Sequence, residues 1–139
     1  MTVILIVEDD EELLNLYVEI LEINRFNVQT AINGEEAISK YKQIHPDLVV
    51  MDGILPKIDG YEAFSQIIEF DKNAKVVIVT GYSEFNAKNK LALEQGLISV
   101  ISKPIGVDEL LNLAKKYCNN KSSGDKNLTS NSNLERSIS

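Results

Sequence analysis

The sequence predicts an α/β fold in which a five-stranded parallel sheet is covered by helices on both faces. Residues 3–7, 48–51 and 76–79 form short apolar runs that are rich in β-branched side chains and not interrupted by polar residues. Such runs are typical of strands that are buried on both sides of a sheet. Residues 26–31 and 98–101 are weaker strand candidates. Helical patterns lie between the strands, so a strand is followed by a helix five times over, which favours parallel strands with right-handed crossovers.

The helical segments are recognised by apolar residues that recur every three or four positions. The residues expected on the buried sides are Leu13, Leu16, Tyr17 and Ile20 in the first helix, Tyr61, Phe64, Ile67 and Ile68 in the third, and Leu110, Leu113, Ala114 and Tyr117 in the last. Gly34, which two glutamates follow, is typical of a helix start, because acidic residues are favourable in the first turn. Gly96 stands where a helix is expected to stop in a left-handed cap.

Length, charge and hydropathy indicate one ordinary soluble domain. The 139 residues include 14 basic and 21 acidic side chains, so the concentrated basic surface that a nucleic-acid binder needs is not expected. No apolar run approaches the ~20 residues that cross a bilayer, and the N-terminus lacks the basic start of a secretory signal. We expect a cytoplasmic domain that binds neither nucleic acid nor membrane directly. Cys118, the only cysteine, is interpreted as a small buried residue.

The composition changes at residue 119. Eleven of the last 21 residues are Asn or Ser, and few are large and apolar. Such a segment cannot bury enough apolar surface to offset the entropy lost on ordering. We expect the folded domain to comprise residues 1–118, and residues 119–139 to be a flexible tail or the start of a truncated linker.

Polar side chains follow four of the five predicted strands. They are Glu8, Asp9 and Asp10 after the first strand, Asp52 after the third, Thr80 after the fourth and Lys103 after the fifth. In open parallel sheets the ligand cleft lies at the carboxyl ends of the strands. The sequence therefore predicts that carboxylates, a hydroxyl and an amine converge at one rim.

These residue types suit magnesium-dependent phosphoryl transfer. Crowded carboxylates repel one another unless a cation lies among them, and Mg²⁺ prefers oxygen ligands. An aspartate such as Asp52 can attack a phosphoryl donor and carry an acyl phosphate. The ammonium of Lys103 can neutralise the transferring oxygens, and Thr80 can donate a hydrogen bond to them. Asp10 is interpreted differently, as the cap of the first helix.

Four motifs resemble the receiver domain of two-component response regulators. They are Val-Glu-Asp-Asp at 7–10, Met-Asp-Gly-Ile-Leu-Pro-Lys-Ile-Asp-Gly at 51–60, Val-Thr-Gly-Tyr at 79–82 and Ser-Lys-Pro at 102–104. No single motif is specific, but all four stand in the right order at the right strand ends. The likeness covers about residues 2–118. It implies a CheY-like domain with a flavodoxin-like (βα)5 three-layer sandwich.

The resemblance also implies roles. Asp52 would accept a phosphoryl group from a sensor histidine kinase or a histidine phosphotransfer protein, with Glu8, Asp9, Asp52 and the backbone carbonyl of Ile54 holding Mg²⁺. The domain would catalyse only its own phosphorylation and dephosphorylation. It would signal to a downstream protein by conformational switching, through the fourth and fifth helices and the strand between them. We expect a monomer or a weak, phosphorylation-dependent dimer.

The sequence departs from the receiver pattern in two places. Family members usually carry an aromatic residue three positions before the lysine, and here that position is Val100. The signal is therefore expected to travel by another route, such as Tyr82 or the loop after Thr80. Family members also often tune hydrolysis with polar side chains at the positions that Ile54 and Tyr82 occupy here. We expect slow autodephosphorylation.

Other functions fit part of this pattern. A small phosphohydrolase with an aspartyl nucleophile usually has a second Asp two residues later, where this chain has Ile54. A pseudo-receiver that only binds partners does not need the full set of site residues. A flavin-binding domain is disfavoured because the acidic loop after the first strand would repel a phosphate. The sequence alone does not decide between a stand-alone receiver and a part of a longer regulator.

Overall fold

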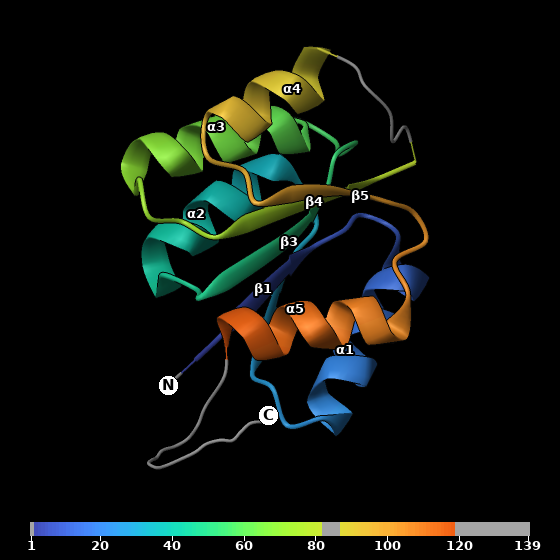
Figure 1. The fold of residues 1–139 in the computed structure, drawn as a ribbon. Coiled ribbons are helices and arrows are strands. Elements are labelled where there is room, and N and C mark those ends of the chain that lie inside the picture. The colour runs from blue at the N-terminus through green and yellow to red at the C-terminus, as the bar shows by residue number, and fades with distance from the viewer. Residues whose placement is uncertain (1, 82–86, 119–139) are drawn as a thin grey trace.

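The strands form one parallel sheet. The computed structural model describes residues 2–81 and 87–118, which contain strands β1 (Ile4–Val7), β2 (Val28–Ala31), β3 (Leu48–Asp52), β4 (Val76–Thr80) and β5 (Ser99–Ser102). The sheet has the order β2-β1-β3-β4-β5, and each neighbouring pair is parallel (Figure 1). Five parallel strands in one sheet are the predicted fold class. Parallel neighbours need a connection that crosses over the sheet, and helices supply these connections here.

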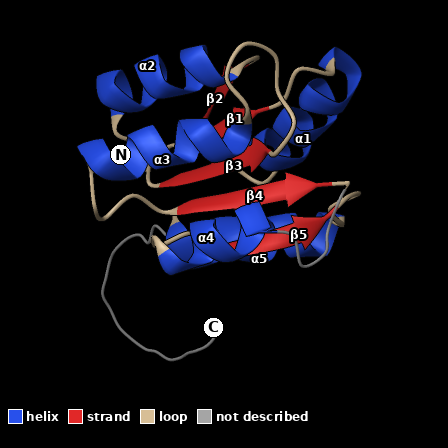
Figure 2. Ribbon diagram, turned by 90° about the horizontal axis from the view of Figure 1, so that it is seen from above, coloured by secondary structure: helices blue, strands red, loops and turns tan. Residues whose placement is uncertain are grey.

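Within the described ranges, five helices cover the two faces of the sheet. They are α1 (Glu11–Ile23), α2 (Gly34–Ile44), α3 (Gly60–Phe70), α4 (Ala87–Glu94) and α5 (Val107–Tyr117). Helices α2, α3 and α4 lie on one face, and α1 and α5 lie on the other (Figures 1 and 2). Alternate residues of the central strands enter the two apolar cores, which explains why these strands show no polar alternation.

The buried side of α1 differs from the prediction. Leu14, Tyr17 and Leu21 are its buried residues, whereas Leu16 is 50% exposed. Leu16 was therefore wrongly assigned to the core, because α1 carries apolar residues around most of its circumference and the spacing alone does not select one stripe. The predicted faces of α3 and α5 are confirmed: Phe64, Ile67, Leu110 and Ala114 are buried, and their predicted neighbours are partly buried.

The start of α1 and the end of α4 are capped at the residues that the sequence predicts. Asp10 accepts a hydrogen bond from the Leu13 backbone N–H at 3.2 Å, which confirms it as the cap of α1. Gly96 has a φ of 116° after α4, and its N–H and that of Leu97 bond back to Leu93 and Ala92. This pattern of two backward bonds is that of a Schellman cap, so the predicted stop at Gly96 is confirmed.

Three other sequence expectations concern Cys118, membrane-spanning segments and the C-terminal tail. Cys118 is 1% exposed, and burial raises the pKa of its thiol to about 12, which fits the interpretation as an inert core residue. Among residues 2–81 and 87–118, none of the helices is both long and apolar enough to cross a membrane. The predicted tail at 119–139 lies outside the described residues.

Gly34, the first residue of α2, allows the loop before α3 to approach closely. A Cβ atom placed on Gly34 would lie 2.0 Å from the backbone carbonyl oxygen of Ile58. Because that neighbour is backbone, it cannot rotate away as a flexible side chain can. The loop between β3 and α3, which follows Asp52 directly, is therefore positioned by the absence of a side chain at Gly34.

We expect Gly34→Ala to lower the free energy of unfolding by about 1–3 kcal/mol, because the loop must move to relieve the overlap. Urea denaturation of the full chain measures this change. Gly81→Ala is the matched control, since a Cβ there meets nothing within 4 Å, and its effect should stay within about 0.5 kcal/mol. Equal effects of the two substitutions would contradict the packing argument.

Candidate functional site

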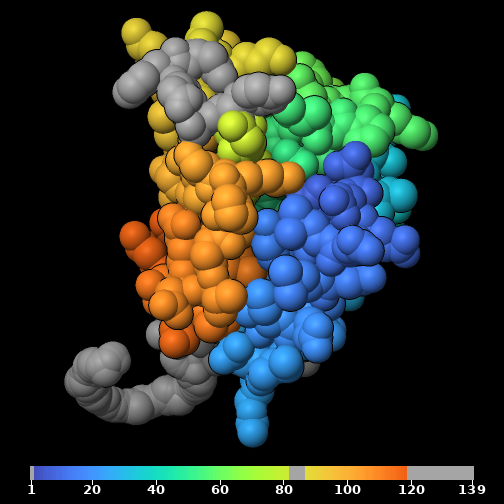
Figure 3. Space-filling model, turned by 90° about the vertical axis from the view of Figure 1, so that its right-hand side faces the viewer, coloured from blue at the N-terminus to red at the C-terminus, as the bar shows by residue number. Residues whose placement is uncertain are grey.

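The carboxyl ends of four strands bring the predicted polar residues to one edge of the sheet. Glu8 follows β1, Asp52 ends β3, Thr80 ends β4 and Lys103 follows β5. Figure 3 looks onto the side of the molecule where the segment after β1 (blue), the segment after β3 (green) and the segment after β5 (orange) meet. Residues far apart in the sequence are neighbours here because parallel strands all end at the same edge.

Three carboxylates lie together at this edge. Glu8, Asp9 and Asp52 each offer an oxygen atom within 4.8 Å of the other two. Glu8 is only 2% exposed and Asp52 only 7%, whereas Asp9 is exposed. Oxygen ligands at this spacing, with one side open to solvent, suit a hard divalent cation that keeps part of its water shell, such as Mg²⁺.

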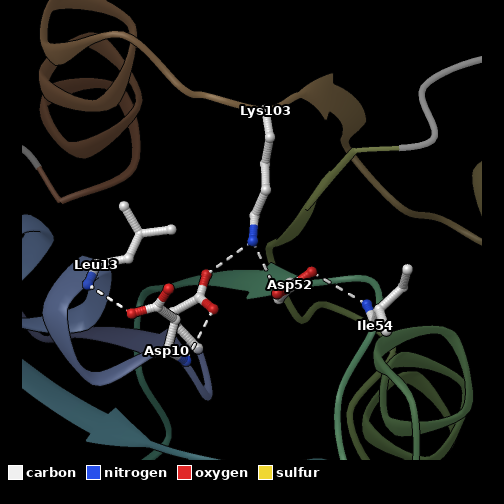
Figure 4. A network of polar contacts seen from close by, with 6 residues as sticks. Asp10, Leu13, Asp52, Ile54 and Lys103 are labelled. Atoms are coloured by element: carbon white, nitrogen blue, oxygen red, sulfur yellow. Dashed lines mark hydrogen bonds and ion pairs between the residues drawn. The ribbon is translucent and has the colours of Figure 1, made fainter.

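Lys103 connects two of these carboxylates. Its ammonium lies 3.1 Å from Glu8 Oε1 and 2.9 Å from Asp52 Oδ2 (Figure 4). The backbone N–H of Lys103 also donates to the carbonyl oxygen of Thr80 at 2.9 Å, which holds the base of the side chain at the end of β4. The sequence predicted the proximity of Lys103 to Asp52, but not its contact with Glu8.

Backbone N–H groups hold the remaining carboxylate oxygens. Ile54 donates to Asp52 Oδ1 at 3.0 Å, and Asp10 donates to Glu8 Oε2 at 3.1 Å (Figure 4). Each buried carboxylate therefore accepts one bond from the backbone and one from Lys103. Each oxygen still has acceptor capacity, because an ionised carboxylate offers about four lone-pair positions. The backbone carbonyl of Ile54 stays a predicted metal ligand.

Burial and charge shift the pKa values of two members of the site. Burial raises the pKa of Glu8, although its hydrogen bonds from Asp10 and Lys103 oppose that change. Burial acts to lower the pKa of Lys103, but its hydrogen bonds to Asp52 and Glu8 outweigh burial and raise it. Lys103 therefore stays an ammonium ion at neutral pH. A fixed cation beside a buried carboxylate can stabilise additional negative charge at that position.

Thr80 ends β4, the strand that pairs with β3 next to Asp52, and it lies beside an aromatic residue. Thr80 is 1% exposed, and its hydroxyl lies beside the phenol of Tyr61, where it acts to lower the pKa of Tyr61 against the larger effect of burial, which raises it. A Cβ placed on Gly53 would meet Tyr61 Cε2 at 3.1 Å and Thr80 Cβ at 3.3 Å, so both residues pack against the backbone that follows Asp52.

Sequence reasoning missed two polar residues next to this group. Tyr61 was assigned only to the apolar side of α3, and its hydroxyl donates a short hydrogen bond to Asn89 Oδ1 on α4. Asn89 is 4% exposed, which is unusual for an asparagine. A phenol at the start of α3 was the available signal for Tyr61. One asparagine in a short helix gives no periodic signal at all.

Of the three residues that depart from the receiver pattern, the structure describes Val100 and Ile54. Val100 lies on β5, is paired with Ile78 and packs against the core under α2, α3 and α4. The side chain of Ile54 is 56% exposed beside Asp52. Tyr82 lies outside the described residues.

Comparison with known proteins places the chain in one family. Residues 4–115 match the sequence model of the response regulator receiver domain. The chain is 42% identical to the chemotaxis protein CheY of Halobacterium salinarum, over 73% of this chain and 83% of that protein. It is 32% identical to the sporulation initiation phosphotransferase F of Bacillus subtilis, over 82% of this chain and 91% of that protein.

Solved structures show the same fold. A CheY-like receiver domain protein from Methanospirillum hungatei superposes with a TM-score of 0.78 at 28% identity, covering 84% of this chain and 92% of that one. A CheX–CheY–BeF3–Mg²⁺ complex from Borrelia burgdorferi gives a TM-score of 0.76 at 33% identity, covering 83% of this chain and 87% of that one. With its strand order, its carboxylate cluster and these likenesses, the chain belongs to the response regulator receiver domain family.

Proposed function

We propose that this receiver domain accepts a phosphoryl group on Asp52 and signals by a change of conformation. The observation that carries the proposal is the contact of the Lys103 ammonium with both Asp52 and Glu8 inside the carboxylate cluster. A buried carboxylate with a fixed cation on one oxygen is oriented for attack and compensated for the charge that it gains.

The proposed donor is the phosphohistidine of a sensor kinase or of a phosphotransfer protein. One oxygen of Asp52 attacks phosphorus, the phosphorus–nitrogen bond breaks, and the imidazole, which is protonated on its other ring nitrogen, leaves as a neutral group with the electron pair. Lys103 neutralises the phosphoryl oxygens, and the Thr80 hydroxyl donates to one of them. Glu8, Asp9, Asp52 and the Ile54 carbonyl would hold Mg²⁺. When bound, Mg²⁺ offsets the repulsion between the phosphoryl group and the carboxylates.

The names of similar proteins support the proposed partners. One relative is named as a phosphotransferase, and one structural neighbour was solved with CheX, BeF3 and Mg²⁺. For this chain we propose a kinase or phosphotransfer protein as donor and a second protein as target, both in the cytoplasm, with residues 1–118 as the signalling unit. It acts as a signalling domain, whose only reactions are its own phosphorylation and dephosphorylation.

Acetyl phosphate with Mg²⁺ should add one phosphoryl group per chain, as measured by intact mass. Asp52→Ala should remain unlabelled, because it lacks the attacking oxygen. Asp108→Ala, which removes an exposed acidic residue at the start of α5, should be labelled like the wild type. Continuous release of phosphate from small phosphomonoesters would instead favour the aspartyl phosphohydrolase, and absence of labelling would favour a pseudo-receiver.

Mg²⁺ should stabilise the fold, because it lowers the repulsion among Glu8, Asp9 and Asp52. We expect saturating Mg²⁺ to raise the free energy of unfolding by about 1–3 kcal/mol. Asp9→Asn should abolish most of this gain. Asp10→Asn is the matched control, since asparagine also caps helices well, and it should respond to Mg²⁺ like the wild type. A full Mg²⁺ response in Asp9→Asn would show that the cluster does not hold the ion.

The phosphorylated domain should lose its phosphoryl group slowly, because the exposed Ile54 side chain cannot orient an attacking water. Ile54→Asn should shorten the lifetime several-fold in Mg²⁺, measured as loss of label from acetyl phosphate-treated protein. Ile23→Asn changes an equally apolar residue that is 71% exposed on α1, and the lifetime should not change. Loss of the wild-type label within seconds would contradict this prediction.

A further inference from the structure

Tyr61 lies between the proposed phosphorylation site and α4. It is the second residue of α3, and its ring packs against Gly53, the residue after Asp52. Thr80 packs against the same glycine. The Tyr61 ring thus lies next to the backbone that follows Asp52, whose carboxylate would carry the phosphoryl group. It is on the side of Gly53 where Thr80 also packs.

The Tyr61 hydroxyl has two polar neighbours. Its O–H donates to Asn89 Oδ1, a buried acceptor on α4. The Thr80 hydroxyl is the second neighbour, and it acts on the pKa of Tyr61. Because the single proton of Tyr61 is directed at Asn89, any hydrogen bond between the two hydroxyls must be donated by Thr80. The three side chains thus follow one another from Thr80 through Tyr61 to Asn89, which is the final acceptor.

A second contact joins the same two helices. Lys88, next to Asn89, lies 3.0 Å from Asp59 Oδ2 and 5.7 Å from the centre of the Tyr61 ring. The side chain of Lys88 is 65% exposed, so water and salt weaken its ion pair. The partly buried bond between Tyr61 and Asn89 is screened less by water and salt.

Val100 cannot take part in such a relay. It has no polar atom, and it packs against the core under α2, α3 and α4. An aromatic side chain that could report on Thr80 is nevertheless present, supplied by α3 instead of β5. The contact of Tyr61 with Thr80 and its hydrogen bond to Asn89 connect the end of β4 to α4 without any contribution from Val100.

We infer that Tyr61 is a positioning residue that reports the state of Asp52 to α4 through competition for the Thr80 proton. The inference rests on the proposed function. The Thr80 hydroxyl has one proton, so it cannot donate to Tyr61 and to a phosphoryl oxygen at the same time. When it turns to the phosphoryl group, Tyr61 loses a donor, its bond to Asn89 loses cooperative support, and α4 is held less tightly.

The test compares the full-length wild type with Tyr61→Phe and Tyr41→Phe, with beryllofluoride and Mg²⁺ as the phosphoryl mimic. Tyr41→Phe is the matched control, because it also removes a tyrosine hydroxyl from a hydrogen bond, here to Asp71 at 2.7 Å. Backbone amide NMR spectra report the shifts of α4 (Ala87–Glu94) and of residues around Asp52. In Tyr61→Phe, the α4 shifts caused by the mimic should be at least about twofold smaller, and the mimic should bind about two- to tenfold tighter.

The inference would be overturned if the mimic caused α4 shifts of wild-type size in Tyr61→Phe. It would also be overturned if Tyr41→Phe reduced the α4 shifts as much as Tyr61→Phe does. Asn89→Ala removes the acceptor on α4 while leaving the Tyr61 ring in place, and it should reduce the α4 response in the same way. Failure of the wild type to bind the mimic at Asp52 would refute the proposed function itself. Binding at Asp52 with an unchanged α4 response in both variants would refute only the role of Tyr61.

Discussion

The contact between the Lys103 ammonium and two buried carboxylates is the interaction on which the site depends. Glu8 and Asp52 are almost fully removed from water, and a buried charge without a partner is strongly destabilising. One cation placed 3.1 and 2.9 Å from them contacts both and neutralises one of the two negative charges. The same contact orients the Asp52 carboxylate, so the stability of the rim and, under the proposed function, its readiness for phosphorylation have one origin.

The parallel sheet explains why the chemistry is confined to the rim. Side chains within β1, β3 and β4 enter one of two apolar cores, so no polar group can be placed there at low cost. The first position at which a strand can present a polar side chain is its carboxyl end. Asp52 and Thr80 end their strands, and Glu8 and Lys103 come one residue later. Burial of both faces and convergence of the site follow from the same topology.

Most of this arrangement could be predicted from sequence, because uninterrupted apolar runs and the polar residues after them are local signals. The exposed Leu16 could not be assigned, since α1 is apolar on too many sides for the spacing to decide. The contact of Lys103 with Glu8 depends on the reach of one side chain between two strands. Tyr61 fitted an apolar helical stripe, and only its three-dimensional contacts show that its hydroxyl donates to Asn89 and that its ring packs beside Thr80.

Helix α4 is the element whose position should respond most easily to such a contact. Its buried residues are Asn89 and Ala92 alone, whereas Leu91 and Leu93 are 56% and 45% exposed. By contrast, α3 buries Ala63, Phe64 and Ile67 against the sheet. A helix with little apolar burial can be displaced at a small cost in free energy. A single hydrogen bond, such as that of Asn89, is then a large part of the interaction that holds the helix in place. Weak apolar packing of α4 is thus what would let a polar relay through Tyr61 reach the surface.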